Sequence, residues 1–269
     1  MRRLSDVIDG RALAVARIGI GVAALINLVE VQMKIDHVLF NETLRMPMWT
    51  WLPNLSTGLM TFASALGVMA AVAVVCGVFT RSAALSLCVL LMALLAWEQQ
   101  VYSNHLVLSA WCLLWLALSR ADARWSFAAR IRGPRDVTFA DQLLLMTQLS
   151  VVYLFTGSLK VNEHFLSGRV IQEWSHLVLP GWTWTAMAGA AVATEVSLAV
   201  GLWIPRVRWI VAAAGLGLHL TIPFVMIMPA PLLTFSLLML SLYPLFLVRS
   251  RPVEDLVAVG PDLVAIARA

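Results

Sequence analysis

Lysine is rare in this chain, and one of its two lysines, Lys160, directly follows a long apolar run. The run extends over residues 143–159, so Lys160 stands where a membrane helix would reach the interface. Burial can lower the pKa of a lysine until the neutral amine acts as a base, whereas an arginine stays charged. Two interpretations follow: Lys160 is a catalytic base, or its stem lies along the helix while the ammonium reaches the headgroups.

Other polar residues interrupt apolar sequence and have competing interpretations. His105 begins an apolar run after Asn104, which is a candidate N-cap, and is either a hydrogen-bonded interfacial histidine or part of a site. Glu195 is costly within a membrane helix unless it is neutral or paired, which favours a structural partner such as Arg17 or another helix. Arg17 is interpreted as a structural residue or as one that contacts a lipid headgroup. His219 lies deep enough in its run to require a hydrogen-bond partner, and a structural and a functional role are equally compatible with its position.

The composition predicts the class of protein that must position these residues. The chain is 61% hydrophobic and 13% charged, with a mean hydropathy of +0.85, which excludes a soluble globular domain. Its continuous apolar runs predict an all-α, polytopic membrane bundle of about eight transmembrane helices. The expected runs are 12–31, 58–79, 82–100, 105–119, 139–157, 182–203, 207–228 and 232–248.

These runs are expected to form one transmembrane domain, residues 1–248, followed by a short cytoplasmic tail, 249–269. The first run is interpreted as a signal anchor rather than a cleaved signal peptide. The three cysteines all fall within runs, so we expect neither a disulfide framework nor a metal site.

The basic residues predict the orientation. If the N-terminus is inside, 14 lysines and arginines fall on inner segments and four on outer ones, the latter being Lys34, Arg45, Lys160 and Arg169. This bias predicts that both termini are cytoplasmic in the cell (plasma or inner) membrane. The pI near 9.3 then reflects topology and contact with anionic lipid, and we expect no nucleic-acid partner.

With this orientation, all five histidines lie in the outer half of the protein. His37, His164 and His176 fall in outer connectors, His105 begins its run at the outer end, and His219 lies just past the middle of the seventh run. The connectors 32–57 and 158–181 are rich in Trp, Pro, Met and His, which suggests an interfacial lid. We therefore expect any chemistry to face outward, with Lys160, His105 and His219 sharing one cavity.

The stretch from Gln148 to Gly168, QLSVVYLFTGSLKVNEHFLSG, resembles a family signature. The family is the vitamin K-dependent gamma-carboxylase-like membrane domain, also called the horizontally transferred transmembrane (HTTM) domain. Further similarities, in order along the chain, are Arg17, the aromatic-x-Arg turn Phe79–Arg81, the Asn-His of Tyr102–His105, Glu195 and His219.

The resemblance implies a quinol-dependent enzyme. Lys160 would be the base that deprotonates a reduced vitamin K or menaquinol, with O₂ and CO₂ as co-substrates, and His105 would support it. Glutamate in a secreted peptide would be carboxylated, a lyase-type reaction, and the quinone would leave as an epoxide. We expect catalysis by Lys160, His105 and His219, and a substrate or quinone pocket containing Asn104, Tyr153, Glu195 and Arg17.

Two classes of function remain open. The first is this outward-facing membrane enzyme, whose partners would be lipid, quinone and a secreted peptide. The second is a non-catalytic membrane partner in the maturation, export or immunity of a secreted peptide. A transporter is disfavoured because the sequence shows neither paired broken helices nor an inverted repeat.

Overall fold

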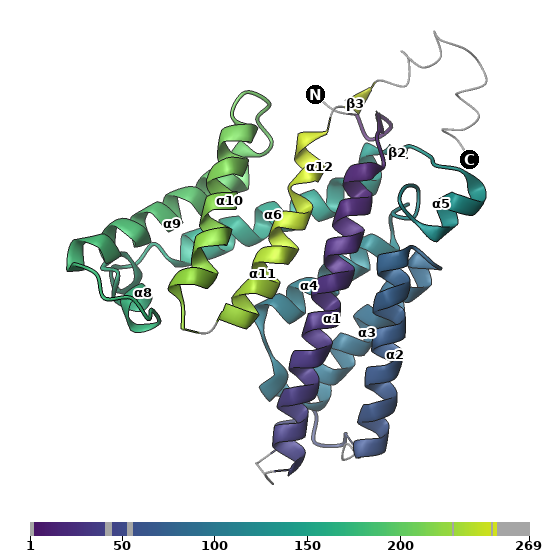
Figure 1. Ribbon diagram of the computed structural model, residues 1–269, viewed down its shortest axis with the longest axis horizontal. Helices are drawn as coiled ribbons and strands as arrows, with labels where there is room; N and C mark the ends of the chain where they lie inside the picture. Colours follow the sequence, from purple (N-terminus) through teal and green to yellow (C-terminus); the bar gives the residue numbers. More distant parts are fainter. Residues whose placement is uncertain (1–2, 41–44, 53–55, 228, 249, 252–269) are drawn as a thin grey trace. The chain divides into compact units, whose positions relative to one another are not determined.

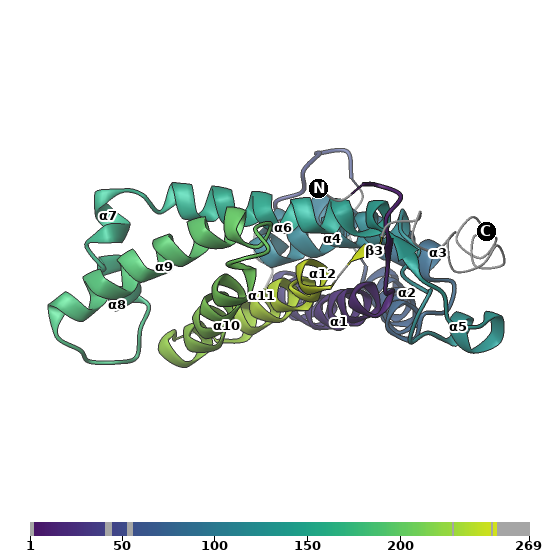
Figure 2. The same cartoon turned by 90° about the horizontal axis from the view of Figure 1, so that it is seen from above.

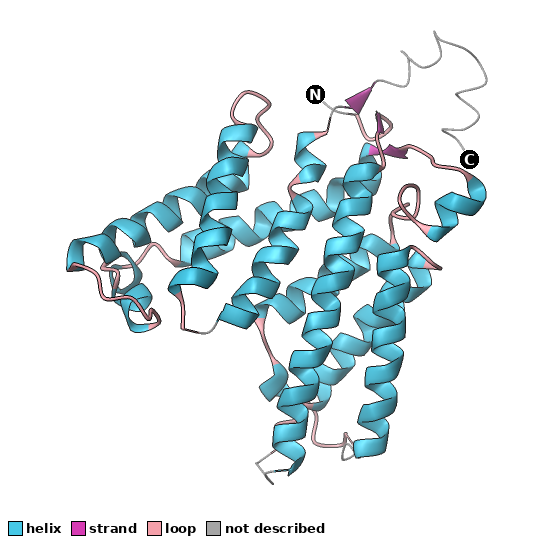
Figure 3. Cartoon of the chain, viewed as in Figure 1, coloured by secondary structure: helices cyan, strands magenta, loops and turns pink. Residues whose placement is uncertain are grey.

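The computed structural model describes residues 3–40, 45–52, 56–227, 229–248 and 250–251, and these are overwhelmingly helical (Figure 3). The helices are α1 (Arg11–Phe40), α2 (Thr57–Cys76), α3 (Thr80–Trp97), the 3₁₀ turn η1 (Gln99–Val101), α4 (Asn104–Ala117), α5 (Phe127–Arg132), α6 (Phe139–Leu159), α7 (Glu163–Leu166), α8 (Arg169–Glu173), α9 (Gly181–Gly201), α10 (Arg208–Val225), α11 (Pro229–Leu242) and α12 (Pro244–Leu247). Three two-residue strands, β1 (Val7–Ile8), β2 (Val137–Thr138) and β3 (Ser250–Arg251), form one antiparallel sheet in the order β2-β1-β3.

The predicted class is confirmed: this is an all-α, multi-pass membrane bundle. Each of the eight apolar runs is helical, and six described helices are long and apolar enough to cross a membrane. The other two runs form shorter apolar helices, Asn104–Ala117 and Pro231–Leu247, the latter divided at Tyr243 into α11 and α12. The number of crossings and the side of each terminus stay predictions. The predicted tail lies outside the described residues except for Ser250 and Arg251.

Two sequence-based details were wrong. The first helix continues to Phe40 instead of ending near residue 31, so Lys34 lies on α1 and not in a connector. Ion pairing of Glu30 with Lys34, one turn apart, helps the helix to continue beyond its apolar part. The N-cap of α4 is Ser103, whose hydroxyl accepts from the backbone N–H of Leu106, and Asn104 is the first helical residue.

The described chain divides into two compact units, residues 1–143 with 248–269, and residues 144–247. In the first unit, helices α1, α2, α3 and α4 form a bundle (Figure 1) in which α2 and α4 each pack against both α1 and α3. A sharp turn at Gly77, whose φ is +69°, ends α2.

Arg17 holds this first unit together from inside. Its side chain is fully buried and donates to four carbonyls, those of Val75, Ala121, Arg124 and Trp125, at 2.5–3.3 Å. These carbonyls belong to the last turn of α2 and to the loop after α4. Arg17 therefore satisfies backbone groups that would otherwise be buried without partners.

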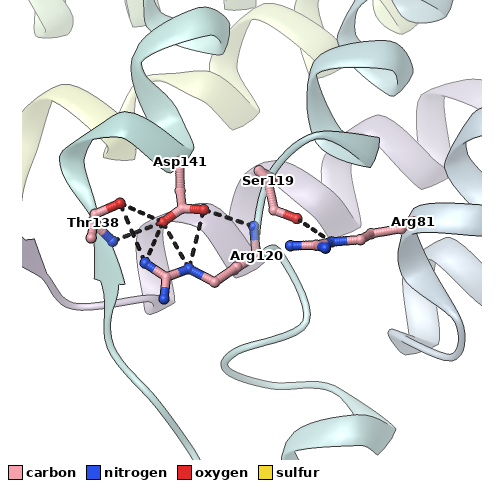
Figure 4. A network of polar contacts seen from close by, with 5 residues as sticks. All are labelled: Arg81, Ser119, Arg120, Thr138 and Asp141. Atoms are coloured by element: carbon pink, nitrogen blue, oxygen red, sulfur yellow. Dashed lines mark hydrogen bonds and ion pairs between the residues drawn. The ribbon is translucent and has the colours of Figure 1, made fainter. Parts of the chain in front are cut away.

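A second polar network in the same unit holds the start of α6 (Figure 4). Asp141, in the first turn of α6, accepts from the backbone and guanidinium of Arg120 and from the backbone N–H and hydroxyl of Thr138. Beside it, Arg81 Nε donates to the carbonyl of Ser119 at 3.3 Å. The carboxylate thus caps α6 and joins its beginning to the loop after α4.

The second unit contains the rest of α6 and helices α7 to α12. Helix α10 packs against both α9 and α11 (Figure 1), and the short helices α7 and α8 pack against α9 (Figure 2). The connector after α8 is joined to the end of α10, because Ile227 N–H donates to the carbonyl of Trp174 and Ser175 pairs with Met226. The predicted outer connector 158–181 is therefore a folded cap on α9 and α10.

Candidate functional site

A cavity of about 340 Å³ lies in the second unit, within the size range of small-molecule sites (about 300–1,000 Å³). Most of its lining is apolar and comes from the cap and from α9, α10 and α11. Three charged or titratable side chains also line it: Lys160, Glu195 and His219. An apolar cavity with a few polar groups is the usual form of a ligand site.

Lys160 and Glu195 form a close ion pair at this cavity. The distance from Lys160 Nζ to Glu195 Oε1 is 2.5 Å, and the side chains are 31% and 8% exposed, respectively. The Lys160 ammonium also lies 5.5 Å from the ring centroid of Phe165, on α7. Lys160 thus turns inward to a carboxylate. The suggested pairing of Glu195 with Arg17 was wrong, because Glu195 pairs with Lys160 whereas Arg17 binds backbone carbonyls of the first unit.

Gly157 lies where α6 approaches α9, next to this ion pair. A Cβ at this position would lie 3.1 Å from Val196 Cγ2 and 3.4 Å from Glu195 Cβ, so α6 approaches α9 closely beside the carboxylate. Two residues after the end of α9, Trp203 Nε1 donates to Ser150 Oγ, in α6, at 2.7 Å. The last turn of α6 lies beside α9 at Glu195, and Lys160, just after α6, reaches this carboxylate.

His219 belongs to a buried chain of hydrogen bonds. Tyr153 OH lies 2.7 Å from His219 Nε2 and 2.6 Å from Tyr243 OH, and all three residues are at most 5% exposed. The ring of Phe235 lies 5.9 Å from that of His219. Gly215 allows Tyr243 to approach α10, because a Cβ there would overlap the Tyr243 hydroxyl.

Two buried polar atoms of the cavity residues have no hydrogen-bond partner among the described residues: Glu195 Oε2 and His219 Nδ1. Buried polar atoms are nearly always paired, so each of these two atoms leaves a hydrogen-bonding capacity unused. Both atoms are fully buried and are not part of the exposed cavity surface, so a bound molecule could reach them only if the side chains moved.

His105 lies in the first unit and is not among the residues that line this cavity. Its Nε2 atom is 2.7 Å from Glu30 Oε2 and 3.2 Å from Ser103 Oγ, and Lys34 Nζ is 2.7 Å from the other oxygen of Glu30. One turn farther into the unit, Asn27 Nδ2 donates to Ser109 Oγ at 2.8 Å. These residues form a second polar cluster, between α1 and α4.

The remaining expected site residues are distributed between the units. Tyr153 contacts His219, as described above, whereas Asn104 and Arg17 belong to the first unit. Asn104 accepts from Tyr102 OH at 2.8 Å, and Arg17 binds backbone carbonyls. The described residues contain no group of three or more His, Cys, Asp or Glu that could hold a metal ion.

Sequence analysis missed three participants: Tyr243, Phe235 and Glu30. Tyr243 is one of only three tyrosines, and it lies within an apolar run, which is a weak signal that a buried hydroxyl needs a partner. Glu30 ends an apolar stretch of α1 and precedes Lys34 by four residues, a spacing that predicts an ion pair but not the contact with His105. Nothing in the sequence around Phe235 distinguishes it from the other apolar residues of its run.

The fold and the cavity define a multi-pass helical membrane protein that contains a largely apolar cavity of ligand size. More specifically, the chain belongs to the HTTM family, whose domain matches residues 6–249. This confirms the resemblance seen in the sequence, and the HTTM domain is associated with vitamin K-dependent carboxylase-type membrane proteins. Comparisons with curated proteins and with solved structures gave no match.

Proposed function

We propose that the cavity of the second unit binds a reduced quinol of the vitamin K or menaquinol type and that Lys160 is its base. The observation that carries the proposal is the inward position of Lys160, in contact with Glu195 and in the lining of an apolar cavity. A quinol dissolves in the bilayer and has a flat apolar ring with polar oxygens. The cavity residues match this pattern, with an apolar lining and an amine.

Lys160 and Glu195 act together in this proposal. An ammonium beside a carboxylate is not a base, so the amine accepts a proton only when the proton shared by the pair resides on Glu195 or when the pair opens. The unpaired oxygen of Glu195 provides a place for that proton. The largely apolar lining of the cavity excludes water from the pair.

When bound, the quinol supplies electrons to O₂ and the strong base that carboxylation of a peptide glutamate by CO₂ requires. The chain's own residues bind the ring, move a proton at Lys160 Nζ and exclude water. Tyr153 holds His219 in place, and the family resemblance assigns His105 a supporting role. The protein would reside in the cell membrane with this site facing outward, where a secreted peptide arrives.

The test is quinol-dependent oxygen uptake and epoxide formation by the purified protein in lipid nanodiscs, with reduced menaquinone or vitamin K. Lys160→Arg keeps the charge and the pairing with Glu195 but cannot release a proton at working pH, so we expect activity to be abolished. Lys160→Ala should also be inactive, with partial recovery on addition of small amines. His105→Ala should reduce turnover less completely, because its role is support.

Lys34→Arg is the matched control, since Lys34 is the other lysine of the chain and also pairs with a glutamate. This variant should retain most of the oxygen uptake. If the unaltered protein takes up no more oxygen than Lys160→Ala, with or without Glu-rich peptides, the enzyme proposal is wrong.

One observation favours a second candidate, a non-catalytic membrane partner in maturation, export or immunity of a secreted peptide. The close ion pair of Lys160 with Glu195 is also what a purely structural link between the end of α6 and α9 would look like. In that case Lys160→Arg would preserve both folding and the partner's function, and co-purification with the secreted peptide would not depend on quinol.

A further inference from the structure

We infer that one end of the first unit carries a docking surface for anionic phospholipid headgroups. The surface combines the exposed aromatic residues Phe79, Trp125 and Phe127 with the exposed arginines Arg81 and Arg130, and we call it the aromatic-basic surface. It lies in the first unit, whereas the ligand-sized cavity belongs to the second, so the inference does not rest on the proposed function.

Two turns that contact each other build this surface. The first turn, residues 77–79, joins α2 to α3, and the second is the end of the loop that leads into α5 (Figure 1). A Cβ on Gly77 would overlap Ser126 Cβ, and the backbone N–H of Ala128 donates to the Gly77 carbonyl at 3.4 Å. The aromatic residues of both turns therefore lie at the same end of the unit.

Each turn holds an aromatic residue in a strained backbone conformation. Phe79 has a φ of 44° and Trp125 a φ of 49°, and within the described ranges they are the only residues other than glycine with a positive φ. This conformation costs free energy for a bulky residue and is usually left to glycine or asparagine. Phe79 is 82% exposed and Trp125 is 58% exposed, so packing within the protein does little to offset the strain. A contact outside the chain gives these rings a role.

The position of the first turn indicates the chemistry of that contact. Residues 77–79 separate α2 from α3, and both helices are long and apolar enough to cross a membrane. A three-residue turn between two such helices lies at the boundary between hydrocarbon and headgroups, where amphipathic aromatic side chains are enriched. On α5, Phe127 and Ile131 are four positions apart and both exposed, so they form one apolar face that fits the same boundary layer.

The arginines give the surface its preference for anionic headgroups. Residues 118–136, which comprise the loop and α5, contain five arginines and two aspartates. Arg120 and Arg124 each pair closely with a carboxylate. In contrast, no carboxylate of the described residues pairs with Arg81, which donates only to a backbone carbonyl, or with Arg130. An exposed guanidinium that lacks a carboxylate partner is suited to bind a phosphate through parallel N–H donors.

The first experiment measures which lipid binds. The full chain, purified in a neutral detergent, is titrated with phosphatidylglycerol or with phosphatidylcholine of the same acyl chains, and native mass spectrometry gives the affinity of the first bound lipid. Phosphatidylglycerol should bind more tightly. Arg81→Gln combined with Arg130→Gln should weaken its binding about 10- to 30-fold and leave phosphatidylcholine unaffected. Arg206→Gln is the matched control, because Arg206 is an exposed arginine of the loop between α9 and α10, in the other unit. It should retain most of the affinity.

The second experiment tests the strained tryptophan. Glycine adopts a φ of 49° without strain, so the thermal midpoint of Trp125→Gly in detergent alone should equal or exceed that of the unaltered protein. Added phosphatidylglycerol should raise the midpoint of Trp125→Gly less than that of the unaltered protein, because weaker binding stabilises less. Trp125→Phe keeps an aromatic ring and should retain most of the effect of the lipid.

Several outcomes would overturn the inference. Equal affinities for the two lipids would do so, as would phosphatidylglycerol binding that survives the loss of both arginines. A lower midpoint of Trp125→Gly in detergent alone would show that the indole holds the fold instead of contacting lipid. If the two arginines are needed for another protein to co-purify but not for lipid binding, the surface serves a protein partner and the inference is wrong. None of these measurements involves oxygen uptake, so the inference and the proposed enzyme succeed or fail separately.

Discussion

Glu195 is the residue on which the two proposed functions differ most clearly. Its carboxylate is almost buried, one oxygen pairs with Lys160 and the other has no partner among the described residues. A base needs a place to which its proton can move, whereas a structural link needs only the charge pair. Loss of the Glu195 carboxylate should therefore lower catalytic activity in the first case and only the stability of the protein in the second.

Glu195→Gln tests this difference. The amide keeps the size and a hydrogen bond but cannot take up the proton that Lys160 would pass to a carboxylate. We expect oxygen uptake to fall roughly 10²-fold, the usual contribution of one proton-transferring group. The measurement is the pH profile of oxygen uptake in the variant beside the unaltered protein. Coincident profiles would show that Glu195 takes no part in proton movement.

The site residues show what a sequence can reveal at this scale. Lys160, Glu195 and His219 each stand out as polar groups in apolar sequence, and so they could be named in advance. Their pairings could not, because Lys160 and Glu195 are 35 residues apart and Tyr153 and Tyr243 are 90 apart. Such contacts depend on how helices pack, which local pattern does not determine.

At the scale of elements, the cap formed by α7 and α8 brings Phe165, Ile171 and Trp174 to the cavity. The two short helices meet at Gly168, whose φ of +82° lies in the left-handed region. A Cβ there would lie 2.6 Å from the backbone nitrogen of Thr185 and 2.6 Å from Trp184 Cβ, on α9. Glycine is therefore required for both the turn and the contact.

Gly168→Ala should accordingly displace the cap from α9. Strain of this backbone conformation costs about 1–3 kcal/mol, and the overlap with α9 adds to it. We expect a lower thermal midpoint and at least a 10-fold loss of naphthoquinone affinity. Gly189→Ala is the matched control, because that glycine is within α9 and a Cβ there meets nothing within 4 Å, so its stability should be equal or higher. Similar behaviour of the two variants would contradict the role assigned to the cap.

The helices were predictable because apolar runs of sufficient length have few alternatives in a membrane. The residues at which the helices end were less predictable from the sequence. Ser103 and Asn104 are both good capping residues, and the choice between them depends on where the preceding chain emerges from η1. The three strands have two residues each, too few to show alternation, and their pairing joins segments far apart in the chain.

At the scale of the whole molecule, sequence analysis expected one domain, and the HTTM match indeed covers nearly the whole chain. Contacts nevertheless divide the described residues into two compact units, with α6 beginning in the first and continuing in the second. The ligand-sized cavity belongs to the second unit and the cluster of His105 and Glu30 to the first. Each unit can therefore be tested by variants of its own.

The orientation predicted from the basic residues has a direct test that uses exposed positions from both units. Val178, in the connector before α9, is 98% exposed, and Arg132, at the end of α5, is also exposed. The charge bias predicts that the first connector is outside the cell and the second is cytoplasmic. Val178→Cys should then react with a membrane-impermeant maleimide on intact cells, whereas Arg132→Cys should react only after permeabilisation. The natural cysteines Cys76, Cys88 and Cys112 all lie on helices, and the unaltered protein measures their background. Labelling of Arg132→Cys on intact cells would show that the orientation is the reverse of the predicted one. The proposed site would then face the cytoplasm, where a secreted peptide could be reached only before export.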